Sequence, residues 1–149
     1  MFLIHIIYNY FIRKGDYNMK INLYRGKLIN RNEWVYGNYL TVKYSSISKD
    51  IIHCICPKDI IVNECSVKNI AVDSLSVGQY TGLVDKINTK IFEGDIVSVG
   101  RYKGIVKWDY ANARYDLYQE DGTSKISGFN ADTMKMALVI GNTYDKLTD

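Results

Sequence analysis

Cysteine and histidine are the side chains of this sequence best suited to nucleophilic or metal chemistry, and they gather in one short run. His53, Cys54 and Cys56 lie within IIHCIC, and Cys65 follows further along the chain. Zinc sites usually join a closely spaced cysteine pair to a second pair, and only one more thiol follows here. Successive strand residues point to opposite faces, so His53 cannot serve as a base for Cys54. We interpret these cysteines as structural, with a metal site as the alternative.

A second candidate for chemistry is the acidic doublet Glu93 and Asp95, which flanks Gly94 in the run EGD. A catalytic carboxylate pair requires a pocket and shifted pKa values. An aspartate just before a strand more often shapes the turn, so we interpret the doublet as architectural. The sequence motifs of serine hydrolases, nucleotide-binding loops and HExxH metalloproteases are absent. We therefore expect a protein without catalytic residues, cofactor or bound metal.

The third candidate is a basic and aromatic segment, GDIVSVGRYKGIVKW, which spans Gly94–Trp108. It resembles the KOW-type strand–loop–strand segment of ribosomal and transcription factors. Interleaved cations and aromatic rings contact phosphates and stack on bases. The candidate nucleic-acid contacts are Arg101, Tyr102, Lys103 and Lys107. Asp109, Asp116 and a net charge of only +3 count against nucleic-acid binding.

The composition indicates a globular β protein as the framework for these groups. The chain has 149 residues, of which 47% are hydrophobic and 23% are charged, as in about one folded domain. Thirteen tyrosines and a single proline favour strands, where a tyrosine ring packs inward while its hydroxyl reaches water. An odd number of cysteines without a secretory signal indicates reduced thiols in a cytoplasm.

Short apolar runs bounded by Gly, Asn, Asp and Ser dominate the chain, and helical periodicity is nearly absent. The clearest expected strands are Trp34–Tyr44, Ile51–Cys56, Gly94–Val99, Gly104–Trp108, Arg114–Tyr118 and Ala137–Gly141. Further expectations are strands at Ile60–Val62 and Ile70–Val72, a hairpin tip at Gln119–Thr123 and a helical turn at Ala131–Met136. This spacing predicts an all-β fold with a small closed or nearly closed barrel, preceded by a β-rich N-terminal part.

The stretch QYTGLVDKINTKIFEGDIV (Gln79–Val97) predicts a hairpin that leads into the barrel. We expect Tyr80 to end one strand, before a turn that contains Gly82. Residues 85–90 form the expected hairpin loop, with Asn88 at a positive φ. The run EGD then turns the chain into the next strand.

This stretch, together with GIVKW and the terminal LVIGNTYD (Leu138–Asp145), resembles the signature of the YopX family of phage and prophage proteins. The upstream YRGKLINRNEWVYGNYL is similar to the opening of that family. The signature positions are Gln79, Tyr80, Thr81, Gly82, Asp85, Phe92, Glu93, Gly94, Asp95, Gly141 and Asn142. One departure is Ile87-Asn88-Thr89, which replaces the Asn-Gly of the family's hairpin loop. The resemblance implies a mainly β protein with an SH3-like barrel in its C-terminal half, encoded in a mobile element and without an established activity.

We expect the chain to divide into residues 19–78, a β-rich N-terminal part, and residues 79–149, the SH3-like barrel. Residues 1–18 are expected to be a non-native leader, with Met19 as the true start. Their apolar run is short for a membrane helix, and its basic residues follow it instead of preceding it as in a signal peptide. The run KGD can also be encoded by a purine-rich ribosome-binding sequence. A membrane-associating peptide is the alternative.

Together these features predict a non-catalytic interaction or assembly module in the cytoplasm of a bacterial host cell. Open sheet edges and many tyrosines favour a homo-oligomer or a protein partner. The alternative is a nucleic-acid-binding accessory protein that uses Gly94–Trp108. An enzyme is the least favoured class, and no membrane partner is expected.

Overall fold

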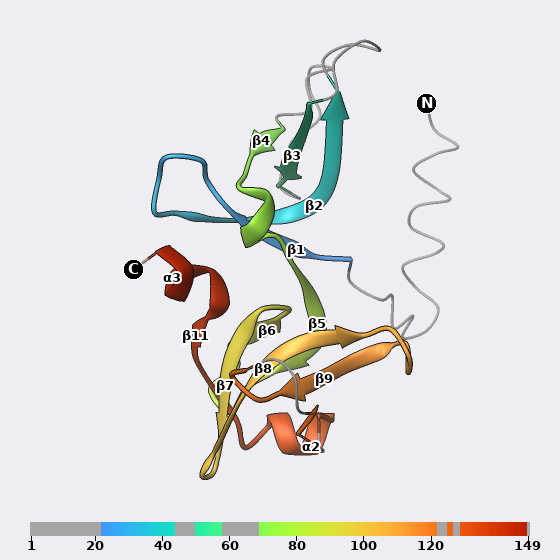
Figure 1. Ribbon diagram of the computed structural model, residues 1–149, viewed down its shortest axis with the longest axis vertical. Coiled ribbons are helices and arrows are strands. Elements are labelled where there is room, and N and C mark those ends of the chain that lie inside the picture. Colours follow the sequence, from blue (N-terminus) through green and yellow to red (C-terminus); the bar gives the residue numbers. More distant parts are fainter. Residues whose placement is uncertain (1–21, 44–49, 58–68, 122–124, 127–128, 149) are drawn as a thin grey trace, which may run out of the picture.

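The structure, a computed structural model, describes residues 22–43, 50–57, 69–121, 125–126 and 129–148. These residues form mainly strands, arranged in two antiparallel sheets (Figure 1). The prediction of an all-β fold is therefore confirmed. Three sequence-based expectations lie outside the described residues: the leader 1–18, the strand at Ile60–Val62 and Cys65. Two more lie partly outside: the strand Trp34–Tyr44, of which the last residue is not described, and the hairpin tip Gln119–Thr123.

The first sheet contains six described strands in the order β4-β3-β2-β1-β5-β6. Their bounds are β1 Tyr24–Lys27, β2 Trp34–Lys43, β3 Ile51–Cys56, β4 Ile70–Ala71, β5 Gly78–Val84 and β6 Lys90–Phe92. A short 3-10 helix, η1 (Ser74–Ser76), lies between β4 and β5, and the side chain of Asp73 caps it. The strands predicted from the aromatic and β-branched runs WVYGNYLTVKY, IIHCIC and IAV are confirmed as β2, β3 and β4.

The second sheet contains five described strands in the order β10-β9-β8-β7-β11. Their bounds are β7 Asp95–Val99, β8 Tyr102–Asp109, β9 Arg114–Tyr118, β10 Lys125–Ile126 and β11 Leu138–Asn142. Two short helices, α2 (Ala131–Met134) and α3 (Thr143–Thr148), flank β11. The strands predicted at GDIVSV, GIVKW, RYDLY and ALVIG are confirmed, as is the helical turn before β11.

The hairpin β5–β6 lies beside the second sheet in the C-terminal half (Figure 1). Residues of β6, of the second sheet and of the α2 segment form one hydrophobic core there. The buried core residues are Ile91, Val97, Val106, Leu117, Met134 and Ala137. This arrangement is the small barrel expected from the sequence, but the barrel is open. No strand ladder joins the two sheets within the described chain, and a backbone bond from Lys86 N to Ala137 O (3.0 Å) crosses the gap instead.

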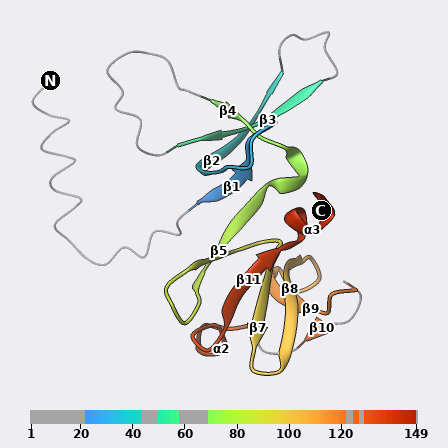
Figure 2. The ribbon, with the colours of Figure 1, turned by 90° about the vertical axis from the view of Figure 1, so that its left-hand side faces the viewer.

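Strand β5 connects the two halves of the molecule. Its start pairs with Tyr24 and Arg25 of β1, and Tyr80 pairs with Phe92 of β6. Both ribbon views show β5 running from the first sheet into the barrel (Figures 1 and 2). The expected boundary between residues 78 and 79 falls inside this strand, and the division into two parts stays a prediction.

The prediction that Tyr80 ends a strand was wrong, because β5 continues to Val84. Gly82 has a φ of +89°, and the register with β6 shifts between Tyr80 and Val84, which makes a bulge within the strand. The Thr81 hydroxyl donates to Ile91 O (2.9 Å) and accepts from Leu83 N (3.2 Å), so it binds backbone groups beside the bulge. A glycine with a positive φ is typical of both a turn and a bulge, so the sequence pattern alone does not distinguish the two.

Asp85 fixes the loop of this hairpin against β11. Its buried carboxylate accepts from Ile87 N (2.9 Å) and Thr89 N (2.8 Å) through Oδ1, and from Val139 N (3.1 Å) through Oδ2. These backbone hydrogen bonds lower the pKa of Asp85 in spite of its desolvation, which acts in the opposite direction. Asn88 has a φ of +65°, which confirms the predicted positive-φ position.

In the terminal signature GNTYD, the Asn142 side chain caps the start of α3. Asn142 Oδ1 accepts from Asp145 N (2.9 Å), and Asn142 Nδ2 donates to Asp145 Oδ2 (2.5 Å). Gly141 lies where the register between β11 and β7 shifts. Thr143 N donates to Gly94 O (2.9 Å), so the terminal segment is held against the EGD turn.

Candidate functional site

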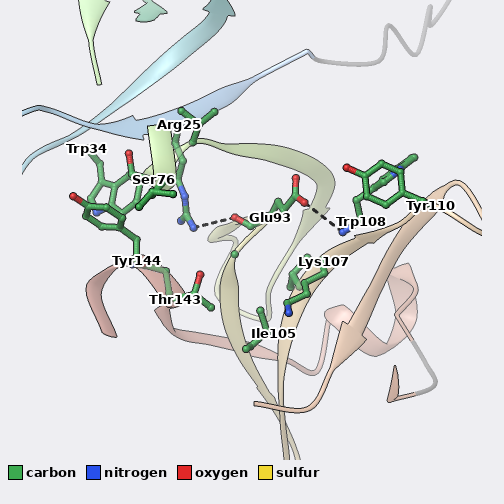
Figure 3. Close-up of a pocket in the computed structure, with 15 residues that line it drawn as sticks. Arg25, Trp34, Ser76, Glu93, Ile105, Lys107, Trp108, Tyr110, Thr143 and Tyr144 are labelled. Atoms are coloured by element: carbon green, nitrogen blue, oxygen red, sulfur yellow. Dashed lines mark hydrogen bonds between the residues drawn. The ribbon is translucent and has the colours of Figure 1, made fainter. Parts of the chain in front are cut away.

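A cleft of about 360 Å³ opens where the first sheet meets the barrel. Figure 3 shows Trp34 and Tyr144 on one side of it, Trp108 and Tyr110 on the other, and Glu93 between them. A neighbouring cavity of about 340 Å³ shares Glu93, Trp108 and Tyr110 with the cleft and continues to Tyr115. We call Trp34 and Tyr144 the Trp34 wall, and Trp108, Tyr110 and Tyr115 the Trp108 wall.

The Trp34 wall already holds two cations of the chain. The rings of Trp34 and Tyr144 meet edge to face, with centroids 6.0 Å apart. The Arg25 guanidinium lies 4.7 Å from the Trp34 ring centroid and 4.9 Å from that of Phe92. Lys27 Nζ lies 5.6 Å from the Trp34 centroid and 5.3 Å from that of Tyr144. Cation–π attraction and packing therefore keep both cations at this wall.

Each of these cations is neutralised by a carboxylate. Arg25 Nη2 lies 2.6 Å from Asp95 Oδ1, and the two side chains are only 10% and 1% exposed. Asp95 Oδ2 accepts from Phe92 N (2.8 Å). Burial raises the pKa of Asp95, although Arg25 acts to lower it. Lys27 pairs with Asp145, and its hydrogen bond is the main reason that the pKa of Asp145 lies below its ordinary value.

The Trp108 wall is built from similar side chains. The rings of Trp108 and Tyr115 meet edge to face, with centroids 5.0 Å apart, because the two residues are cross-strand partners on β8 and β9. The Tyr115 hydroxyl donates to Gln79 Oε1 (3.1 Å), and burial beside Glu93 raises the pKa of Tyr115 well above its usual range. Tyr110 is 89% exposed. Among the described lysines and arginines, none makes a cation–π contact with these three rings.

The two carboxylates of the EGD turn lie at different walls: Glu93 at the Trp108 wall and Asp95 at the Trp34 wall, where it pairs with Arg25. Gly94 has a φ of +83°, and Gly94 N donates to Val106 O (2.8 Å). Glu93 lines the cleft and the cavity of the Trp108 wall, and its Oε1 accepts a long hydrogen bond from Trp108 N (3.4 Å). Asp95 pairs with Arg25 and borders a different cavity. The two carboxylates therefore do not face each other across one pocket.

The structure separates the four candidate nucleic-acid contacts. Arg101, Tyr102 and Lys103 lie together at the exposed tip of the β7–β8 hairpin, beside Gly100, which has a φ of +60°. Lys107 lies roughly 13 Å further along β8. It lines the cleft, and its Nζ lies 5.9 Å from the Tyr118 ring centroid.

The two aspartates that count against nucleic-acid binding are engaged within the second sheet. Asp116 Oδ2 lies 2.7 Å from Lys125 Nζ and 3.0 Å from Arg114 Nε. Asp109 also pairs with Lys125. Hydrogen bonds from Asn112 and Lys125 hold the pKa of Asp109 well below its ordinary value. These ion pairs tie β8, β9 and β10 together.

His53 and Cys54 of the segment IIHCIC have the contacts and burial that are typical of residues that stabilise a fold. His53 Nδ1 lies 2.6 Å from the Tyr39 hydroxyl, and the two rings stack with centroids 5.9 Å apart. Cys54 is buried, which raises the pKa of its thiol and disfavours the thiolate. Over the part of the chain that the structure covers, no three His, Cys, Asp or Glu side chains gather into a group that could hold a metal ion. In the same residues, no helix has the length and apolar character needed to cross a membrane.

Sequence reasoning singled out Glu93 and named Trp108 only as part of the basic and aromatic segment, and it missed Trp34, Tyr110, Tyr115 and Tyr144. Trp108 and Tyr115 lie on strands that the sequence predicted correctly, so their cross-strand pairing was a usable signal. The contact of Trp34 with Tyr144 joins β2 to α3, and no local pattern in the sequence indicates it.

Comparison with known protein families identifies a match to this chain. The family model described as YopX protein matches residues 23–146, a range that includes both sheets and both walls of the cleft. A search of curated proteins finds no match.

Proposed function

The chain belongs to the YopX family, and we propose that it acts as a non-catalytic binding module for a protein partner. Family membership supports a phage-type protein. The observation that carries the proposal is the cleft between the sheets, where aromatic rings from both halves surround Glu93. Tyrosine and tryptophan are enriched in protein interfaces and dominate their binding energy.

The exposure of the cleft rim supports a binding role. Tyr110 and Leu75 both line the cleft, and both side chains are largely exposed. Exposed aromatic and aliphatic groups beside a concave surface gain hydrophobic free energy when a partner covers them. A partner chain that enters the cleft would contact the first sheet and the barrel together.

The non-catalytic part of the proposal rests on how the ionisable groups are used. Asp95 and Asp145 neutralise buried or half-buried cations, and Asp85 accepts three backbone hydrogen bonds. His53 contacts the Tyr39 hydroxyl rather than a thiol. Each group thus has a structural task that its chemistry explains without a substrate.

Nuclear magnetic resonance titration of the full chain tests the module. The probes are short Gly-Ser peptides with a central arginine, lysine, glutamate or tyrosine. We expect at least one of them to shift the signals of cleft residues such as Val77, Glu93 and Trp108. A panel in which no peptide perturbs the cleft would overturn the proposal.

Nucleic-acid binding is the second candidate, and the exposed tip of the β7–β8 hairpin favours it. Arg101 and Lys103 are exposed there, with the Tyr102 ring beside them. Binding to single-stranded DNA, duplex DNA and RNA, measured over a range of salt concentrations, tests this candidate. Salt-sensitive binding that depends on the hairpin tip would favour it over the protein-binding module.

We also propose a cytoplasmic location in the bacterial host cell and assembly into a homo-oligomer. Cys54 and Cys56 are free thiols, which suits a reducing compartment. The edge strands β4 and β6 of the first sheet, within the described chain, suit pairing with another copy. Light scattering coupled to gel filtration tests the oligomer, and a monomer at micromolar concentration would overturn it.

A further inference from the structure

We propose that the Trp108 wall binds an arginine side chain of a partner protein, with Glu93 as its counter-ion. The inference rests on the proposed function, because it names the chemistry that the cleft recognises. It assigns the cavity of about 340 Å³ beside Trp108, Tyr110 and Tyr115 as the arginine pocket.

The Trp34 wall supplies the internal template for this assignment. There an arginine, Arg25, lies 4.7 Å from a tryptophan ring and 2.6 Å from the carboxylate of Asp95. The same three kinds of group are needed to hold a partner's arginine: an aromatic face, a second ring and a carboxylate. The chain thus shows that its own architecture stabilises an arginine in such surroundings.

The cavity of the Trp108 wall has the rings and the carboxylate, but no described lysine or arginine lines it, since Arg25 and Lys107 border the adjoining cleft and not this cavity. Glu93 is the only charged residue among the described residues that line its cavity. The hydrogen bond that Glu93 accepts from Trp108 N is long, at 3.4 Å, and engages only Oε1. A carboxylate beside apolar rings is stabilised when a cation pairs with it. The site is therefore complementary to a positive charge.

Arginine fits this pocket better than lysine does. Its planar guanidinium stacks flat on aromatic faces and pairs with a carboxylate through two parallel hydrogen bonds, whereas an ammonium contacts a ring as a point charge and cannot form that bidentate pair. The rings of Trp108 and Tyr115 line the same cavity as Glu93 and lie at 75° to each other. Tyr110 lines the same cavity and is 89% exposed, so its ring is placed to cover a guanidinium that enters.

A titration of the full chain with matched peptides tests the inference. The probes are a short Gly-Ser peptide with one central arginine and its counterparts with lysine or citrulline, which is neutral and nearly isosteric with arginine. We expect the arginine peptide to shift the Trp108 indole and Gln79 side-chain signals. Compared with the arginine peptide, the citrulline peptide should bind at least about tenfold more weakly. The lysine peptide should bind at least about threefold more weakly than the arginine peptide.

Two substitutions, each with a matched control, locate the effect. Glu93→Gln keeps an oxygen that can accept from Trp108 N but removes the negative charge. It should weaken binding of the arginine peptide about tenfold and leave the affinity for the citrulline peptide unchanged. Asp132→Asn removes an equal charge from an exposed side chain on α2 and should change neither. Tyr110→Ala should weaken binding of the arginine peptide severalfold. Tyr110→Phe should not weaken this binding, because the aromatic ring remains. The exposure of Tyr110 keeps this second test independent of folding.

The outcomes separate this inference from the proposed function. Equal affinity for the arginine and citrulline peptides, or an unchanged affinity in both Glu93→Gln and Tyr110→Ala, would overturn the arginine pocket. Binding of other peptides in the cleft would then leave the module standing. Lysine binding as tight as arginine binding would overturn the choice of arginine. A chain whose cleft responds to no peptide would overturn both proposals.

Discussion

The two walls of the cleft use the same kinds of residue in opposite ways. At the Trp34 wall, the chain supplies its own cations, Arg25 and Lys27, and pairs them with carboxylates. At the Trp108 wall, rings and a carboxylate are present without a cation from the described residues. The Trp34 wall therefore holds the two sheets together, whereas the Trp108 wall is the surface that we propose for a partner.

Burial explains this difference. An ion pair as buried as that of Arg25 and Asp95 is costly to break, because either partner alone would be a desolvated charge. Glu93 and Tyr110 keep contact with water, so removal of one charge or ring there costs little folding free energy. Similar chemistry thus stabilises the fold in one place and can serve recognition in the other.

Loss of the carboxylate at the Trp34 wall should have the largest effect. Asp95→Ala leaves the Arg25 guanidinium buried without its counter-ion and should lower the unfolding free energy by about 3–5 kcal/mol. Urea denaturation monitored by tryptophan fluorescence measures the change. The double variant Arg25→Met/Asp95→Leu should lose clearly less, because no unpaired charge remains.

Glu93→Gln is the matched change at the other wall. It should alter the unfolding free energy by less than about 1 kcal/mol. Equal losses of unfolding free energy in Asp95→Ala and Glu93→Gln would contradict the distinction between a stabilising Trp34 wall and a binding Trp108 wall.

The turn that joins the two walls should show the next largest effect. Gly94 has a φ of +83°, and an added Cβ would lie 3.3 Å from Thr143 Oγ1, so Gly94→Val should cost more than about 1 kcal/mol. Gly141→Val is the control, since Gly141 has no atom within 4 Å of the added Cβ and no positive φ. An unchanged melting temperature for Gly94→Val would contradict the architectural interpretation of EGD.

The strands and the EGD turn were predictable because their signals are local. Short runs of β-branched and aromatic residues mark β2 and β7, and a glycine between two acidic residues marks a turn. The loop position of Asn88 was likewise predictable from its tolerance of positive φ. Gly82 was misjudged because the distinction between a bulge and a turn depends on the partner strand β6.

The cleft was not predictable, because it depends on contacts between distant elements. The pairing of Arg25 with Asp95 joins β1 to β7, and that of Lys27 with Asp145 joins β1 to α3. A buried arginine looks like an exposed one in a single sequence. The sequence led us to interpret Glu93 and Asp95 as architectural, and the different partners of their two carboxylates follow only from the fold.

Acid should weaken the Lys27–Asp145 pair of the Trp34 wall by a smaller amount. The pKa of Asp145 is lowered from 3.8, mainly by Lys27, so its contribution is present above that value and is lost as the pH falls through the folded-state pKa. Because the Asp145 side chain is 43% exposed, Asp145→Asn should cost less than about 1 kcal/mol at neutral pH.

The difference in unfolding free energy between wild type and Asp145→Asn should therefore shrink below about pH 4. Comparison of the two chains isolates Asp145 from Asp95, whose raised pKa acts in the opposite direction. Urea denaturation at several pH values measures this trend, and a difference that grows on acidification would contradict it.

The smallest effect is expected at the tip of the β7–β8 hairpin, which lies outside both walls. Arg101→Ala/Lys103→Ala removes two exposed cations and should change the unfolding free energy by less than about 0.5 kcal/mol. Under the protein-binding module, the same variant should also leave peptide binding at the cleft unchanged. If the hairpin instead binds nucleic acid, the variant should weaken that binding and reduce its salt dependence by about two ion equivalents. Fluorescence anisotropy with labelled DNA and RNA distinguishes these results. A salt dependence reduced by two ion equivalents would show that the hairpin tip, and not the Trp108 wall, is the binding surface.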